Sequence, residues 1–171
     1  MRETVRMDTP GSTDPDWRQY DPDLAIASPI LRRMLALWQE RRGTRAMPSR
    51  QDFAAEDLMQ FSGRVLLIDV EYAPRRYRFR LVGTLIVDLL QRDLTGRYFD
   101  DVYTPAQLAV LARSSDYCTE TRRPLRIMSR LNYADRSHIQ IEVLEMPLSS
   151  DGATVDMIMK CVVEQDEADP A

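Results

Sequence analysis

The clearest pattern in this chain is an alternation of apolar and cationic side chains within an arginine-rich segment. Tyr77, Phe79 and Leu81 alternate there with arginines. A period of two places successive side chains on opposite faces of a β-strand. We therefore expect a strand with one aromatic and apolar face and one cationic face. Gly83 then permits a sharp exit into a short helix, and Gly96 is expected to close that helix.

Helical periodicity precedes and follows this strand. Ser28 can cap the start of a helix, Pro29 suits its first position, and Gly43 ends it. A short helix over residues 54–61 and a longer one over residues 104–121 are also expected. The apolar face of the first helix consists of Ile30, Leu31, Met34, Leu35 and Trp38.

Four further segments have the composition and alternation of strands: residues 65–72, 125–133, 137–148 and 155–164. Short connections between strands favour antiparallel neighbours. The order of helices, two strands, helices and three strands predicts an α+β fold. We expect a five-stranded antiparallel sheet with helices on one face, preceded by the N-terminal helix.

The composition is that of one folded domain. The 171 residues are 44% hydrophobic, which is enough for a single core. Residues 1–27 are polar and proline-rich and read as a flexible arm, residues 28–165 as the domain, and residues 166–171 as an acidic tail. The net charge of -4 disfavours general binding of nucleic acid, which needs a basic surface.

The arginines of the alternating strand have two interpretations. If this strand pairs with residues 65–72 as a hairpin, its cationic face lies beside Asp69 and Glu71. Cross-strand charge pairs of this kind each contribute about 0.2–1 kcal/mol. The arginines are then part of a charge-matched, solvated surface. The alternative is a surface that binds anions.

The cysteines and the single histidine restrict the chemistry. Cys118 and Cys161 are isolated, which fits a reducing cytoplasm better than a disulfide framework. With His138 alone, no set of four zinc ligands can be assembled, so we expect no metal. No run approaches the roughly 20 apolar residues needed to span a bilayer. We expect a soluble, cytoplasmic protein without membrane contact.

Five short motifs together resemble PAS domains of the PAS_5 type, found as short stand-alone proteins in alphaproteobacteria. The resemblance covers residues 28–165, and the expected order of elements is the PAS topology. It implies a sensory or regulatory module without catalytic activity, which binds a small molecule, a signalling partner protein, or both. The motifs are Leu37-Trp38 before Arg41-Arg42-Gly43, Met47-Pro48-Ser49-Arg50 with Asp52, residues 77–84, Asp93-Leu94-Thr95-Gly96, and Met146-Pro147-Leu148.

A PAS domain usually works through a cavity between the inner face of its sheet and its helices, so the resemblance implies a ligand site there. Simple core packing is the alternative for every apolar residue named. Thr84, Asp88 and Tyr98 could place polar groups beside the cavity, or could be capping and surface residues. The main apolar candidates are Tyr77, Phe79, Ile127, Met157 and Met159, with Leu81, Leu85, Leu89, Leu90, Leu131, Ile141 and Val143 as further wall residues.

The sequence does not support haem or a flavin that reacts covalently with a cysteine, two cofactors that PAS domains commonly use. Haem needs an axial ligand such as a histidine, and the helix at residues 105–121 has none. His138 stands in a turn and is expected to face water. Flavin photochemistry through a covalent bond needs a cysteine in a particular helix motif, which the residues around Cys118 do not match. We expect no cofactor and read Cys118 as a small buried hydrophobe.

Enzyme motifs are also missing: the chain has no GxSxG, P-loop, HExxH or GxGxxG sequence. We therefore expect no catalysis. Two alternatives to a ligand sensor remain. One is a purely structural interaction module with a filled core, and the other is a small α+β hydrolase or isomerase that uses Asp88 in the cavity.

The first helix carries more apolar surface than one stripe requires. Leu37 lies off the face of Ile30, Met34 and Trp38, and Trp and Met are enriched at interfaces. Two-fold homodimers are the commonest closed assembly. We predict a homodimer through these four residues and the adjacent outer sheet surface. The alternative is a monomer whose helix packs inward.

Overall fold

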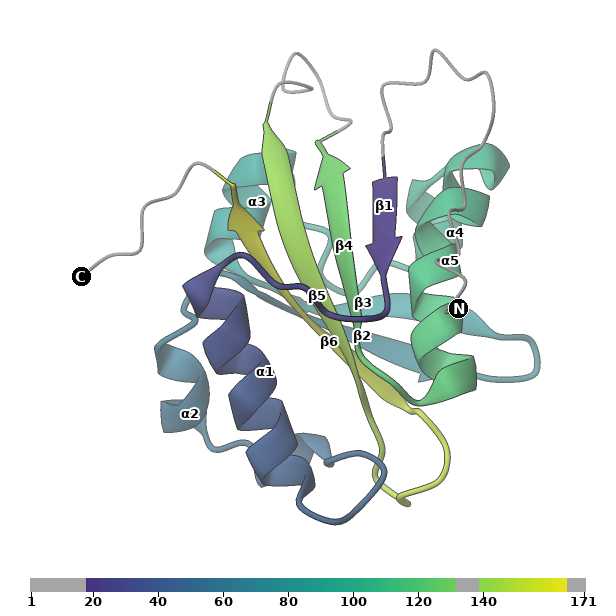
Figure 1. The fold of residues 1–171 in the computed structure, drawn as a ribbon. Helices are drawn as coiled ribbons and strands as arrows, with labels where there is room; N and C mark the ends of the chain where they lie inside the picture. Colours follow the sequence, from purple (N-terminus) through teal and green to yellow (C-terminus); the bar gives the residue numbers. More distant parts are fainter. Residues whose placement is uncertain (1–17, 132–138, 166–171) are drawn as a thin grey trace, which may run out of the picture.

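The computed structural model describes residues 18–131 and 139–165. Its centre is one antiparallel sheet in the order β1-β4-β5-β6-β2-β3 (Figure 1). The strands are β1 (Arg18–Asp21), β2 (Val65–Glu71), β3 (Arg76–Val82), β4 (Leu125–Arg130), β5 (Gln140–Leu148) and β6 (Met157–Glu164). The helices are α1 (Pro29–Arg42), a 3-10 turn (Arg50–Asp52), α2 (Ala55–Met59), α3 (Thr84–Leu90), α4 (Phe99–Val102) and α5 (Pro105–Thr121).

The α+β class is confirmed, but the expected count of five strands is wrong. The sixth strand is β1, which comes from the segment expected to be a flexible arm and pairs with β4 at the edge of the sheet. Tyr20 of β1 packs partly buried against the core, and its hydroxyl donates to the Val110 carbonyl of α5 at 3.4 Å. A strand of four residues has too little pattern of its own to be recognised by alternation.

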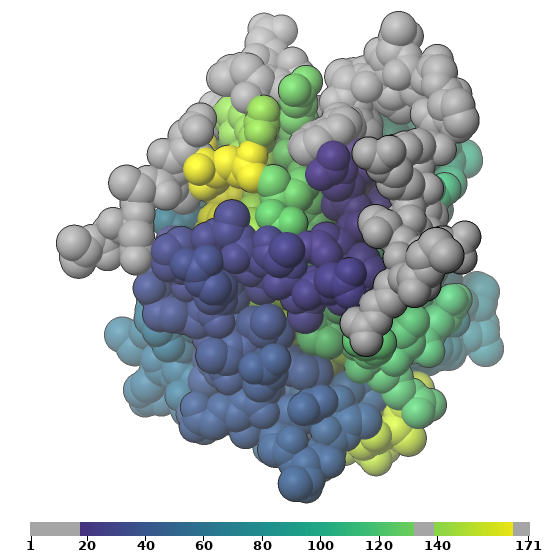
Figure 2. Space-filling view, in the orientation of Figure 1, coloured from purple at the N-terminus to yellow at the C-terminus, as the bar shows by residue number. Residues whose placement is uncertain are grey.

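Helices cover both faces of the sheet, which corrects the expectation of a single covered face. Glu142 and Glu145 of β5 must point to opposite faces, because they are an odd number of residues apart. Glu142 accepts hydrogen bonds from the Ala27 and Ser28 amides at the start of α1, at 3.0 Å each, whereas Glu145 accepts one from Ser114 of α5. We call the α5 side the inner face and the α1 side the outer face. Figure 2 shows the outer side, where the purple and blue segments from β1 to α2 cover much of the sheet.

Local signals explain where α1 begins and ends. The Ser28 hydroxyl accepts from the Leu31 amide at 3.3 Å, Pro29 occupies the first turn, and Gly43 follows the last turn with a positive φ of 59°. The indole of Trp38 donates to the buried Pro147 carbonyl at 3.0 Å and holds the helix against β5.

The turn from β3 into α3 depends on Gly83, as expected. The reason is that no room is left for a side chain at this position. A Cβ at this position would overlap the carbonyl of Gly63, while the Gly83 amide donates to the Val65 carbonyl at 2.9 Å. Gly96 does not close α3, which ends at Leu90 with Gln91 in the left-handed conformation. Instead, the Gly96 amide donates to the Phe79 carbonyl at 2.6 Å, so the segment around Gly96 covers the free edge of β3.

The arginines of β3 have carboxylate partners on the outer surface. Asp69 of β2 lies 3.5 Å from Arg78 and 3.4 Å from Arg80, and Arg76 lies 2.9 Å from Asp100. The Arg76 guanidinium also stacks on the Tyr98 ring at 3.8 Å. The charge-matched interpretation of this surface therefore holds.

Candidate functional site

The inner face of the sheet and helices α3, α4 and α5 line a partly open cavity of about 130 Å³. Its walls come from all six strands and from these helices. The expected wall residues that line it are Phe79, Leu89, Leu90, Ile127, Leu131, Ile141 and Val143, and further residues are Arg18, Leu66, Ile86, Phe99, Tyr103, Leu111, Ser129, Glu145, Lys160 and Val162.

Three aromatic rings form one side of the cavity. Phe79 of β3 lies 4.6 Å from Phe99 of α4 between ring centroids, and Tyr103 meets Phe99 edge-on at 6.0 Å. Such tilted and edge-to-face pairs are favoured by the charge distribution of aromatic rings. Burial raises the pKa of the Tyr103 hydroxyl, so it is neutral near pH 7. This side of the cavity therefore offers uncharged aromatic surface.

A buried ion pair also lines the cavity, close to the Phe99 ring. The Lys160 ammonium on β6 is 2.8 Å from Oε1 of Glu145 on β5, and the two side chains are 12% and 3% exposed. The same oxygen accepts from the Ser114 hydroxyl of α5 at 2.8 Å, and Lys160 also donates to Ser115 at 3.2 Å. The ammonium lies 5.7 Å from the centroid of the Phe99 ring, within reach of a cation–π contact.

The fold places this pair through strand register. Glu145 and Lys160 are directly opposite each other in the antiparallel ladder of β5 and β6. Helix α5 crosses the same face, so the Ser114 and Ser115 hydroxyls supply some of the hydrogen bonds that a buried ion pair requires. Cys118 of α5 is fully buried beside them, and burial, then the negative charge of Glu145, raises the pKa of its thiol well above the usual value. Cys118 is therefore a neutral core residue, as expected.

The expected site residues Met157 and Met159 lie on the wrong face for this cavity. Their neighbours Lys160 and Val162 line the inner cavity, so the odd-numbered positions of β6 face α1. The alternation of β6 could not indicate its inner face, because both faces of this strand are buried by helices.

The polar candidates also lie elsewhere. Thr84 and Asp88 are on α3 and do not line the cavity. Tyr98 donates to Glu71 of β2 at 2.9 Å on the exposed outer side. Leu81 and Leu85 are exposed, at 44% and 38%, rather than wall residues. Leu81, Thr84 and Leu85 flank the turn between β3 and α3 at Gly83, whereas Tyr98 precedes α4.

Tyr77 is buried but belongs to a neighbouring hollow. Its hydroxyl donates to Asp116 of α5 at 2.5 Å, and burial, followed by this hydrogen bond, raises its pKa. The hollow has a volume of about 500 Å³ and lies between β3, α4 and α5, with Arg75 and Arg76 at its side. Arg75 is held there by Asp116 and Glu120 at 3.2 and 3.0 Å.

Lys160, Glu145 and Ser114 were not among the site residues expected from the sequence. One signal was available for the first of them. Lys160 is the single lysine in a chain whose other 22 basic residues are arginines, and it interrupts an apolar strand. Glu145 gave no comparable signal, because the chain has 27 acidic residues and only the register of β5 singles this one out.

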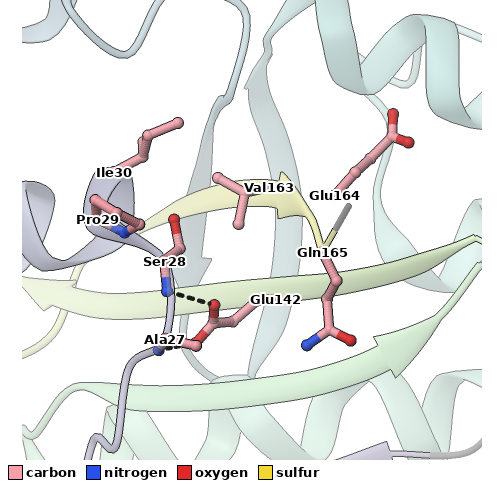
Figure 3. A pocket seen from close by; sticks show the side chains of 8 residues that line it. All are labelled: Ala27, Ser28, Pro29, Ile30, Glu142, Val163, Glu164 and Gln165. Atoms are coloured by element: carbon pink, nitrogen blue, oxygen red, sulfur yellow. Dashed lines mark hydrogen bonds between the residues drawn. The ribbon is translucent and has the colours of Figure 1, made fainter. Parts of the chain in front are cut away.

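A second hollow lies on the outer face, where α1 begins (Figure 3). It has a volume of about 150 Å³ and lies between residues 27–30, Glu142 and residues 163–165. The dashed lines of Figure 3 show that Glu142 is engaged by backbone amides of the chain that enters α1. Arg126 adds an ion pair to Glu142 at 2.6 Å and one to Asp21 at 3.1 Å. These contacts secure β1 and α1 to the sheet, which is a structural role.

The residues expected at a dimer interface are buried within the chain. Ile30, Met34, Leu37 and Trp38 are at most 9% exposed and pack on the chain's own sheet. The expectation that Leu37 lies off the buried face is wrong. A dimer through these four residues would require α1 to leave the sheet. Dimerisation itself stays a prediction, which sedimentation equilibrium at micromolar concentration can test against the mass of 19.8 kDa.

Two observations bear on cofactors, metals and membranes. His138 lies outside the described residues. Within residues 18–131 and 139–165, the structure contains no group of three or more potential metal ligands, and no helix there is long and apolar enough to cross a membrane.

Comparison with known proteins agrees with the topology. The family model PAS_5, described as a PAS domain, matches residues 26–163. The protein thus has the fold of a PAS domain, a class of sensory and signalling modules that is generally non-catalytic. The chain belongs to the PAS_5 family.

No curated protein matches this chain. Among solved structures, it resembles that of a point variant of RsLOV, with 10% sequence identity and a TM-score of 0.46. The match covers 85% of this chain and 73% of the other.

Proposed function

We propose that the protein is a non-catalytic sensory module that binds a compact small molecule in the inner cavity and relays its binding to a partner protein. The supporting observation is the cavity itself, with apolar and aromatic walls and one charged, hydrogen-bonded pair. Small-molecule sites commonly combine a mostly apolar lining with a few convergent polar groups.

The size of the cavity restricts the ligand. A volume of about 130 Å³ is below the roughly 300–1,000 Å³ of pockets for drug-sized ligands. It is close to that of an engineered apolar cavity of about 150 Å³ in another protein that binds benzene. A ligand that fits without rearrangement therefore has about the size of one six-membered ring.

A thermal-shift and NMR screen of compact metabolites tests the proposal. A ligand that binds only the folded state raises the free energy of unfolding by RT ln(1 + [L]/Kd), about 2.7 kcal/mol at a hundredfold excess over Kd. The variant Val143→Phe fills the inner cavity and should abolish the effect. Val163→Phe is the matched control, because it places the same side chain in the outer hollow.

The opposite result would favour a purely structural interaction module. If no compact compound in a broad set shifts the melting temperature or the NMR spectrum, the cavity is not a ligand site and the core has only a packing role. The hydrolase or isomerase alternative relied on Asp88 in the cavity, and the position of Asp88 on α3, outside the cavity wall, removes that basis.

The relay requires a second protein, and no surface of the described residues is assigned to it. Affinity capture with and without a bound ligand would test for a partner whose binding changes with occupancy of the cavity. Cytoplasmic location also stays a prediction from the isolated cysteines.

A further inference from the structure

The polar end of the inner cavity has hydrogen-bonding capacity left over. The Lys160 ammonium carries three N–H groups, and the described residues supply two acceptors: Oε1 of Glu145 at 2.8 Å and Oγ of Ser115 at 3.2 Å. One N–H group therefore remains without an oxygen acceptor among the described residues, and the Phe99 ring is its neighbour at cation–π distance. Since Lys160 lies in the cavity wall, such an acceptor can belong to a ligand.

Glu145 has spare capacity on its second oxygen. Oε1 accepts two hydrogen bonds of 2.8 Å, from Ser114 and Lys160. Oε2 has a contact of 3.5 Å with the Ser115 hydroxyl, which is longer than the roughly 2.5–3.0 Å of an ordinary O–H···O bond. A buried carboxylate oxygen gains from a closer donor, because a poorly satisfied buried acceptor costs free energy. The pair thus offers one donor and one acceptor side by side.

The charge balance of the pair restricts what can meet it. Lys160 and Glu145 neutralise each other, so a carboxylate ligand beside Glu145 would be repelled and a cationic one beside Lys160 likewise. A hydroxyl group is uncharged and can both accept from the ammonium and donate to the carboxylate. A ketone lacks the donor, and a hydrocarbon lacks both groups.

We propose that the cavity selects a compact, uncharged ring compound bearing one hydroxyl group, for which phenol is the simplest probe. This inference rests on the proposed function. The hydroxyl accepts from Lys160 and donates to Oε2 of Glu145, while the ring packs against the contacting rings of Phe79 and Phe99. The specificity comes from the ion pair, and the apolar walls contribute affinity without distinguishing hydroxylated from plain rings.

The test is an NMR titration of the isotope-labelled protein with four probes: phenol, toluene, cyclohexanone and benzoate. Phenol is expected to bind about tenfold or more tightly than toluene, as a hydrogen bond to a charged group allows. Cyclohexanone should be weaker than phenol because it cannot donate to Glu145. Benzoate should also be weaker. Tighter binding of benzoate would overturn the proposal and indicate recognition of a carboxylate, for instance by Arg18 in the same wall.

A double variant tests the role of the pair. Removing one partner leaves an unpaired buried charge and endangers folding, so Lys160→Met and Glu145→Leu are combined. This variant should bind phenol and toluene within about twofold of each other. The matched control combines Arg126→Met with Glu142→Leu, which removes the buried pair on the outer face. The control should keep the full preference for phenol.

The possible failures separate the two proposals. If phenol and toluene bind equally well to the unmodified protein, and Val143→Phe abolishes both, the cavity is a ligand site but the ion pair does not select a hydroxyl. If none of the four probes perturbs the cavity residues, the cavity is not a site for ring compounds and this inference is wrong. If the control variant loses the preference as the test variant does, the preference does not come from Lys160 and Glu145.

Discussion

Glu142 and Glu145, three residues apart in β5, are both buried at 2% exposure and lie on opposite faces of one sheet. Each carboxylate is paired with a cation of a neighbouring strand, Arg126 of β4 and Lys160 of β6. Glu142 of the outer pair accepts hydrogen bonds from the Ala27 and Ser28 amides and so holds the chain that enters α1. Glu145 and Lys160 of the inner pair both line the inner cavity, whereas Glu142 is the member of the outer pair that borders the outer hollow. The outer pair therefore has a structural role, and the inner pair is the one for which we propose a ligand.

Breaking the inner pair should be costly. Lys160→Met alone leaves Glu145 as an uncompensated buried charge, and we expect it to lower the free energy of unfolding by about 3–5 kcal/mol. The double variant with Glu145→Leu should be clearly more stable than this single variant, because no buried charge remains. Urea unfolding of both variants measures the difference. Equal stability of the two would mean that the pair is solvated in solution.

Removing the outer carboxylate should loosen the start of α1. Glu142→Gln replaces a charged acceptor of the Ala27 and Ser28 amides and leaves Arg126 with Asp21. We expect a loss of about 1.5–3 kcal/mol in stability and faster amide hydrogen exchange at residues 27–31. Glu56→Gln, at an exposed position of α2, is the control and should change neither. Unchanged exchange in the Glu142 variant would show that these amides have other acceptors.

Gly83→Ala should destabilise through a clash. Its φ of -63° suits any residue, so the cost comes from overlap of the new Cβ with the Gly63 carbonyl. We expect about 1–3 kcal/mol or more, as for other overpacked sites. Gly96→Ala is the comparison, since nothing lies near its Cβ and only the positive φ of 84° opposes alanine, at about 1–2 kcal/mol. Thermal unfolding measures both, and a Gly83 variant as stable as the wild type would contradict the close approach.

Stability should fall at alkaline pH because of a buried thiol. Burial raises the pKa of Cys161 from 9.0 to about 12. Since the unfolded thiol ionises first, the stabilising contribution is complete below the unfolded pKa and is lost as the pH rises toward 12. The slope for this one group is at most about 1.4 kcal/mol per pH unit. Urea unfolding of wild type and Cys161→Val between about pH 7 and pH 10.5 should give a shallower decline for the variant, and parallel curves would exclude this contribution.

Interactions between residues close together in the sequence determined most of the helices and strands. The first turn of α5 follows from Thr104, whose hydroxyl accepts from the Gln107 amide at 3.3 Å while Gln107 reaches back to the Thr104 amide at 3.0 Å. Ser28 and Pro29 define the start of α1 in the same way. The alternation of β3 identified Phe79 as a cavity residue. Contacts within a few residues decide both helix starts, so the sequence was sufficient to predict them.

The tertiary structure decided which face of each central strand lines the inner cavity. Helices cover both faces of β5 and β6, so apolar residues occupy odd and even positions alike, and the alternation no longer distinguishes inside from outside. The sequence therefore pointed to Met157 and Met159, whereas the inner face carries Lys160. Strand β1 is likewise stabilised by pairing with β4, which is distant in the sequence. The candidate site depends on strand register and on how helices cross the sheet, and these are set by packing between distant segments, such as Ser114 of α5 and Glu145 of β5, which are 31 residues apart.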